Sequence, residues 1–126
     1  MLHIRLWRIL AAVVAVGILV LSLLPKPPEI PIGFSFADKI AHFAAYLILG
    51  FLTLTSISGG KRTRLALSAV LTVIGLCVFY GGLIEILQMF TGRQPEFLDL
   101  TADLVGAIFG ALLGIGLLRR VHRKQA

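Results

Sequence analysis

The sequence has little cysteine and little charge. Its single cysteine, Cys77, excludes an intramolecular disulfide and leaves a thiol redox centre without a second sulfur. Charged residues make up 14% of the 126 residues, whereas hydrophobic residues make up 58%. This balance excludes a water-soluble domain, which could not bury so much apolar side chain. We interpret Cys77, which lies within an apolar run, as a small buried apolar residue.

Acidic residues are scarce: the chain has six, against twelve Lys and Arg, and its net charge is +6. In a soluble protein this excess of basic residues would suggest nucleic acid as a partner. Here the basic residues flank long apolar runs, where they act as signals of membrane topology. We therefore expect membrane lipids, and no nucleic acid, as partners.

Four apolar runs are each long enough to cross a membrane, which takes about 20 residues as a helix. They cover about residues 4–24, 40–58, 65–90 and 97–118. The first run ends at the prolines of residues 25–28 and lacks a small-x-small cleavage site, so we expect it to remain as a helix. The sequence thus predicts one all-α domain over residues 1–126, an integral membrane bundle of about four transmembrane helices.

The basic residues predict how this bundle is oriented. Nine of them lie at the amino end, in the second loop or in the tail: Arg5, Arg8, Lys61, Arg62, Arg64, Arg119, Arg120, Arg123 and Lys124. Only Lys26, Lys39 and Arg93 fall on the other side. Because basic residues accumulate on the cytoplasmic side, we predict that both termini are cytoplasmic, with the first and third loops outside.

All six acidic residues fall in the outer half of this arrangement: Glu29, Asp38, Glu85, Glu96, Asp99 and Asp103. Glu85 lies roughly 7 Å from the outer end of its helix at 1.5 Å per residue. A carboxylate at the membrane centre costs on the order of 3 kcal/mol unless it is paired, hydrated or protonated. We therefore expect Glu85 to face protein or water, and Glu29, Glu96 and Lys26 to be solvated loop charges.

Helical spacing predicts that several polar residues share faces. The pairs are Asp38 and His42, His42 and Tyr46, Glu85 and Gln88, and Asp99 and Asp103. In the fourth run, small residues recur every four positions at Ala102, Gly106, Gly110 and Gly114. Such spacing lets helix backbones approach closely, so we expect Asp103 to point into a helix interface.

These polar residues occur in an order that resembles the VanZ-like family. Its pattern D-K-x-x-H-F, E-x-x-Q, R, D-x-x-x-N-x-x-G matches Asp38-Lys39-x-x-His42-Phe43, Glu85-x-x-Gln88, Arg93 and Asp99-x-x-x-Asp103-x-x-Gly106. The resemblance covers about residues 36–114, and this chain has Asp103 where the family pattern has asparagine. It implies a protein of the bacterial inner membrane, and the family takes its name from a member associated with low-level teicoplanin resistance. It implies no established reaction.

The first functional hypothesis is a binding module. It places an outer-leaflet polar pocket around His42, Glu85, Gln88, Arg93, Asp99, Asp103 and Tyr46, which binds the headgroup of a lipid or a lipid-linked envelope precursor. Arg93 would contact phosphate or carboxylate, for which guanidinium has bidentate geometry. Such binding could alter glycopeptide susceptibility.

Three alternatives stay open. In an intramembrane enzyme acting on a lipid-linked substrate, His42 and Glu85 exchange protons while Asp38 orients the imidazole. A small transporter is a further alternative, and it would require a homo-oligomer to form a pathway. The polar residues could also simply lock the helices together. A metal variant of the enzyme would use His42 with Glu85, Asp99 or Asp103 as ligands. No recognised metal-ligand spacing such as H-E-x-x-H is present, and we predict neither a metal nor another cofactor.

The topology prediction is testable with reporter fusions. We expect fusions at both termini to report the cytoplasm and a fusion within residues 91–95 to report the outside, because of the distribution of basic residues. An outer amino terminus would overturn the outer placement of the acidic residues.

Overall fold

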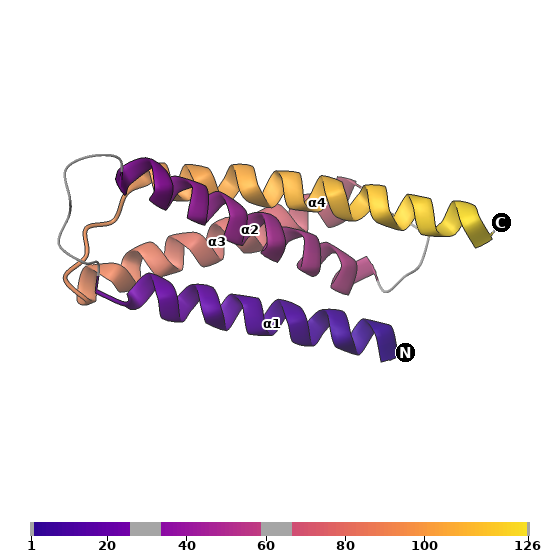
Figure 1. Cartoon of the computed structure of the whole chain (residues 1–126), viewed down its shortest axis with the longest axis horizontal. Coiled ribbons are helices and arrows are strands. Elements are labelled where there is room, and N and C mark those ends of the chain that lie inside the picture. Colours follow the sequence, from indigo (N-terminus) through magenta and orange to yellow (C-terminus); the bar gives the residue numbers. More distant parts are fainter. Residues whose placement is uncertain (1, 26–33, 59–66, 126) are drawn as a thin grey trace.

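A computed structural model describes residues 2–25, 34–58 and 67–125 of the chain. Four helices follow one another: α1 at Leu2–Leu23, α2 at Phe34–Ser58, α3 at Leu67–Phe90 and α4 at Phe97–Gln125. Consecutive helices run antiparallel, and both termini lie at the same end of the bundle (Figure 1). Each helix contains a stretch long and apolar enough to span a membrane. The predicted all-helical fold with four membrane-spanning helices is confirmed.

Two helices are longer than their apolar runs predicted. α2 begins at Phe34 rather than at residue 40, and α4 continues to Gln125 rather than ending at residue 118. Asp38 and Lys39 interrupt the hydropathy of α2, but they do not interrupt the helix. The basic residues at the end of α4 are good helix formers and interact favourably with the negative end of the helix dipole. The predicted start of the third helix at residue 65 lies outside the described residues.

α2 and α4 form the largest helix interface. A Cβ atom added at Gly106 would lie 2.3 Å from the Phe43 carbonyl oxygen, and one at Gly110 would lie 2.1 Å from that of Leu47. On α2, a Cβ atom added at Gly50 would lie 2.8 Å from the Ala107 carbonyl oxygen of α4. We call these three positions the glycine seam. The predicted close approach of helices at the small residues of the fourth run is therefore confirmed.

The interior of the bundle is narrow, and most large apolar side chains point outward. Its core includes Leu54, Val73, Cys77 and Ile84, which confirms the buried interpretation of Cys77. Apolar side chains such as Phe79 are exposed on the outer faces of the helices. Lipid tails are as apolar as these side chains, so a membrane gives this outer surface a suitable solvent. The Tyr80 hydroxyl of α3 donates to the Ala15 carbonyl oxygen and joins α3 to α1.

The glycine seam predicts that adding one methyl group to α4 lowers the stability of the bundle at some glycine positions and not at others. Gly110→Ala should destabilise the bundle by about 1–3 kcal/mol, the usual cost of overpacking, because the new methyl meets a backbone carbonyl. Thermal unfolding of the purified protein in detergent measures this effect. Gly116→Ala is the matched control on the same helix, because a Cβ there meets nothing within 4 Å among the described residues. Equal melting temperatures for the two variants would contradict the seam.

Candidate functional site

Polar side chains gather at the end of the bundle opposite the two termini. There α2 packs on the beginning of α4, and Lys39 donates to both the Glu96 and the Asp99 carboxylates. Asp99 is only 2% exposed although it lies in the first turn of α4. Its burial is compensated by Lys39 and by the positive end of the α4 dipole. Lys39 is thus a structural partner of α4, which the sequence analysis did not anticipate.

His42 lies one turn further along α2, between two carboxylates of α4. Its Nδ1 lies 2.8 Å from Oδ1 of Asp103, and its Nε2 lies 3.6 Å from Oδ2 of Asp99. A carboxylate accepts hydrogen bonds, so Nδ1 carries the proton of the bond to Asp103. Asp103 is 1% exposed and points into the α2–α4 interface, as its spacing predicted. The carboxylate hydrogen-bonded to Nδ1 is therefore that of Asp103, in the position where the family pattern has asparagine.

Glu85 connects α3 to the start of α4. Its Oε2 accepts a hydrogen bond of 2.8 Å from the Glu96 backbone N–H. The residue is 8% exposed, which agrees with the expectation that Glu85 faces protein. Its Oε1 has no hydrogen-bond partner among the described residues. Glu96 lies in the loop before α4, as expected, and its side chain is 40% exposed. Its carboxylate also pairs with Lys39, which the expectation of a solvated loop charge did not include.

Gln88 and Arg93 act on the carboxyl end of α1, whose last carbonyl groups have no partner within their own helix. Gln88 donates to the Ser22 carbonyl oxygen at 3.0 Å, and Arg93 donates to the Ser22 and Leu24 carbonyl oxygens. Gly92 reverses the chain after α3 with a φ of +75°, and the Arg93 backbone N–H returns to the Gln88 carbonyl oxygen at 3.1 Å. Only glycine adopts such a φ without strain. This turn directs Arg93 toward α1.

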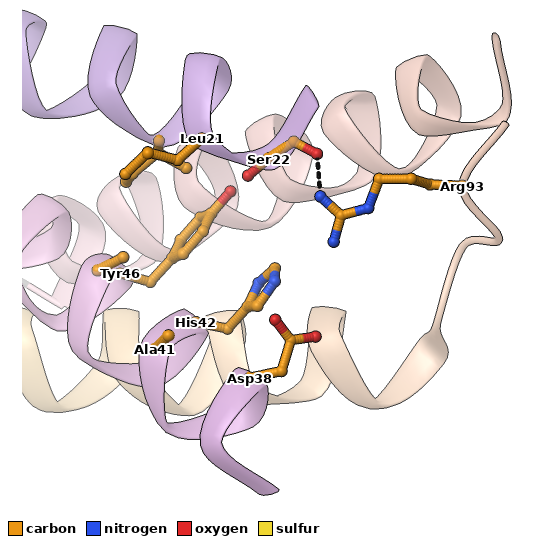
Figure 2. Close-up of a pocket in the computed structure, with 9 residues that line it drawn as sticks. Leu21, Ser22, Asp38, Ala41, His42, Tyr46 and Arg93 are labelled. Carbon is orange, nitrogen blue, oxygen red and sulfur yellow. Dashed lines mark hydrogen bonds between the residues drawn. The ribbon is translucent and has the colours of Figure 1, made fainter. Parts of the chain in front are cut away.

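A pocket of about 160 Å³ opens between α1 and α2 beside these residues. Figure 2 shows Asp38, His42 and Tyr46 projecting from α2, with Arg93 facing them from across the pocket. Ile18, Leu21, Ala41 and Ala45 make the apolar part of its wall. Tyr46 is 1% exposed, and its hydroxyl has no hydrogen-bond partner among the described residues. The pocket therefore has an apolar wall and a charged rim, and the side chain of Tyr46 that lines it ends in a buried hydroxyl without a partner among the described residues.

Gly81 of α3 leaves room for two of these polar groups. A Cβ atom added there would lie 2.7 Å from Asp103 Oδ2 and 3.3 Å from the Tyr46 hydroxyl. The missing side chain at this position thus lets the Asp103 carboxylate and the Tyr46 ring lie against α3. The sequence analysis did not identify Gly81, because the signal is a contact between three helices.

The predicted site residues divide into two groups. Asp38, His42, Tyr46 and Arg93 line the pocket, with Asp99 and Asp103 behind His42. Glu85 and Gln88 instead contact the start of α4 and the end of α1. Of the charged residues named in the sequence analysis, Lys26, Glu29, Lys61, Arg62 and Arg64 lie outside the described residues. The catalytic and binding roles predicted for these side chains stay predictions.

The fold and the cluster define a small multi-pass α-helical membrane protein with ionisable residues collected at one end of its bundle. The family model described as VanZ/LLP1 matches residues 4–119, and the chain belongs to this family. The match includes α1, which the resemblance over residues 36–114 did not. No curated protein and no solved structure matches the chain.

The geometry around Gly81 predicts a local change in the site. Gly81→Ala should displace the Asp103 carboxylate, because the new methyl would lie 2.7 Å from Oδ2, and so weaken the hydrogen bond to His42. The Nδ1 proton resonance of His42 in ¹⁵N-histidine-labelled protein reports this bond. Gly82→Ala is the control, since a Cβ there meets nothing within 4 Å among the described residues. Identical His42 resonances in both variants would show that Gly81 does not position Asp103.

Proposed function

We propose that this protein binds the headgroup of a lipid or of a lipid-linked envelope precursor in the pocket between α1 and α2. One observation carries this proposal: the pocket joins an apolar wall to a rim of Asp38, His42 and Arg93 (Figure 2). A molecule with an acyl chain and a polar headgroup needs these two surfaces side by side. Ligand pockets commonly combine an apolar lining with a few polar groups that fix orientation.

The polar groups suit a headgroup that carries phosphate or carboxylate together with hydroxyl or amine. Arg93 offers a guanidinium, which binds phosphate or carboxylate in bidentate geometry. Asp38 offers an acceptor for a hydroxyl or ammonium group, and the Tyr46 hydroxyl offers a further donor or acceptor. A buried polar group without a partner costs about 1–3 kcal/mol, so a ligand that pairs with Tyr46 recovers this cost.

The side of the membrane on which the ligand binds is part of the proposal. With both termini cytoplasmic, the end of the bundle that carries the pocket lies at the outer leaflet. A protein that holds a lipid-linked envelope precursor there changes how much of it is accessible at the surface. This would connect the pocket to glycopeptide susceptibility, teicoplanin included, which the family resemblance suggests.

An intramembrane enzyme is the second candidate, and the 2.8 Å contact between His42 Nδ1 and Asp103 favours it. A carboxylate that holds one imidazole nitrogen leaves the other available as a base or an acid. In this candidate Asp103, rather than Asp38, orients His42, while Glu85 holds the start of α4 and has Oε1 available for proton exchange. Conversion of an added lipid-linked substrate by the purified protein separates the enzyme from the binding module, which only retains it.

The Tyr46 hydroxyl provides the sharpest test of binding. Tyr46→Phe should reduce co-purifying lipid without lowering thermal stability, because the hydroxyl has no described protein partner to lose. Native mass spectrometry of protein gently extracted from its own membrane measures the bound lipid. Lipid retention equal to wild type would show that Tyr46 only packs.

Arg93→Ala should lower specific lipid binding roughly tenfold or more, since a hydrogen bond to a charged group contributes about 1.5–3 kcal/mol. Arg119→Ala removes the same side chain from the exposed opposite end of the bundle and serves as the control. Arg93→Lys keeps the charge without the bidentate geometry, so its affinity should be intermediate. Equal lipid loss in the Arg93 and Arg119 variants would favour a nonspecific lipid shell and a purely structural polar cluster.

A further inference from the structure

We propose that Asp38, His42 and Asp99 form a binding site for a divalent transition-metal ion of the Zn²⁺ or Mn²⁺ class. One ligand atom from each of these side chains lies within 4.8 Å of the other two. Asp38 and His42 lie one turn apart on α2, but Asp99 comes from α4, so no short spacing in the sequence indicates the full set of ligands. This inference goes beyond headgroup binding and does not depend on it.

The Nε2 atom of His42 lies close to a carboxylate oxygen of Asp99. When the ring is neutral and Nδ1 carries the proton shared with Asp103, Nε2 is an acceptor, and it lies 3.6 Å from Oδ2 of Asp99. Two acceptors do not attract one another without a cation or a proton between them. In a tetrahedral zinc site with bonds of about 2.1 Å, adjacent ligand atoms lie about 3.4 Å apart. The separation between Nε2 and Oδ2 is close to that value.

Two neighbouring residues support the ligands as the outer shell of a metal site does. A metal-bound histidine commonly donates its other N–H to a carboxylate, which fixes the ring and raises its basicity. Asp103 accepts from His42 Nδ1 in this way while 1% exposed. Lys39 donates to Oδ1 of Asp99, and Oδ2 of the same carboxylate faces His42. Each ligand on the α2–α4 interface thus has an independent partner that orients it.

Charge and position favour a cation at this place. Five carboxylates of the described residues, at Asp38, Glu85, Glu96, Asp99 and Asp103, accompany only two fixed cations, Lys39 and Arg93, at this end of the bundle. One imidazole with two carboxylates suits Zn²⁺ or Mn²⁺ better than an all-oxygen Mg²⁺ or Ca²⁺ site. Asp38 and His42 also line the pocket, so an ion held by them is reached from it. The competing arrangement is a protonated His42 that pairs with both Asp99 and Asp103.

The full chain in lipid-free detergent, stripped with EDTA, tests this site by calorimetric titration with Zn²⁺ and Mn²⁺, and with Mg²⁺ for comparison. We expect one equivalent of Zn²⁺ or Mn²⁺ to bind the wild type, and Asp99→Asn to abolish this binding. Glu96→Gln removes the other carboxylate that accepts from Lys39 and should keep binding. Asp103→Asn should weaken binding by roughly 10- to 100-fold, the usual effect of losing a partner of a metal-bound histidine.

X-ray absorption at the zinc edge of the wild type gives a test that does not depend on any variant folding. We expect one imidazole among nitrogen and oxygen ligands, without sulfur. The proposal is overturned if no stoichiometric Zn²⁺ or Mn²⁺ binds, if the zinc spectrum lacks imidazole, or if His42→Ala and Asp99→Asn bind as the wild type does. Lipid retention by the same preparations is measured separately, so failure of the metal site leaves headgroup binding to its own test.

Discussion

The contact between the backbones of α2 and α4 at the glycine seam determines what the polar end of the bundle can do. Because Gly106 and Gly110 have no side chain, the α4 backbone lies against the Phe43 and Leu47 carbonyl groups. This short distance brings Lys39 and His42 within reach of carboxylates on α4. A side chain at the seam would push the helices apart and leave those carboxylates inside the bundle without their partners. Burial of charge here is thus a consequence of helix packing.

Much of the fold could be predicted because its signals are local. Apolar length predicts a membrane helix wherever the run occurs, and spacing of four predicts a shared face, as for Asp99 and Asp103. The pairings at the site could not be predicted, because they depend on how far each helix is rotated against its neighbours. His42 has an acid one turn away on its own helix, yet its Nδ1 meets Asp103 of another helix. The α1 carbonyl groups that Arg93 contacts carry no sequence signal at all.

The metal proposal and the headgroup proposal use different parts of one region. Arg93 and Tyr46 belong to the pocket, while Asp99 and Asp103 lie behind His42 in the helix interface. His42 and Asp38 belong to both. A metal at their position would add positive charge to a wall that now carries a carboxylate, and this charge would favour a phosphate in the pocket. The two proposals are therefore compatible, although neither requires the other.

Arg93 lines the pocket and at the same time donates to the last carbonyl groups of α1. A ligand that draws the Arg93 guanidinium away removes a hydrogen bond from the Ser22 carbonyl oxygen. The ligand must then donate to this oxygen itself, or Gln88 remains its only side-chain donor among the described residues. Occupancy of the pocket and attachment of α1 are then linked equilibria, in which each changes the other by the same factor. The ligand nevertheless needs α1 in place, because Ile18 and Leu21 of α1 form part of the apolar wall of the pocket. The first helix is thus both a wall of the pocket and a competitor of the ligand for one side chain.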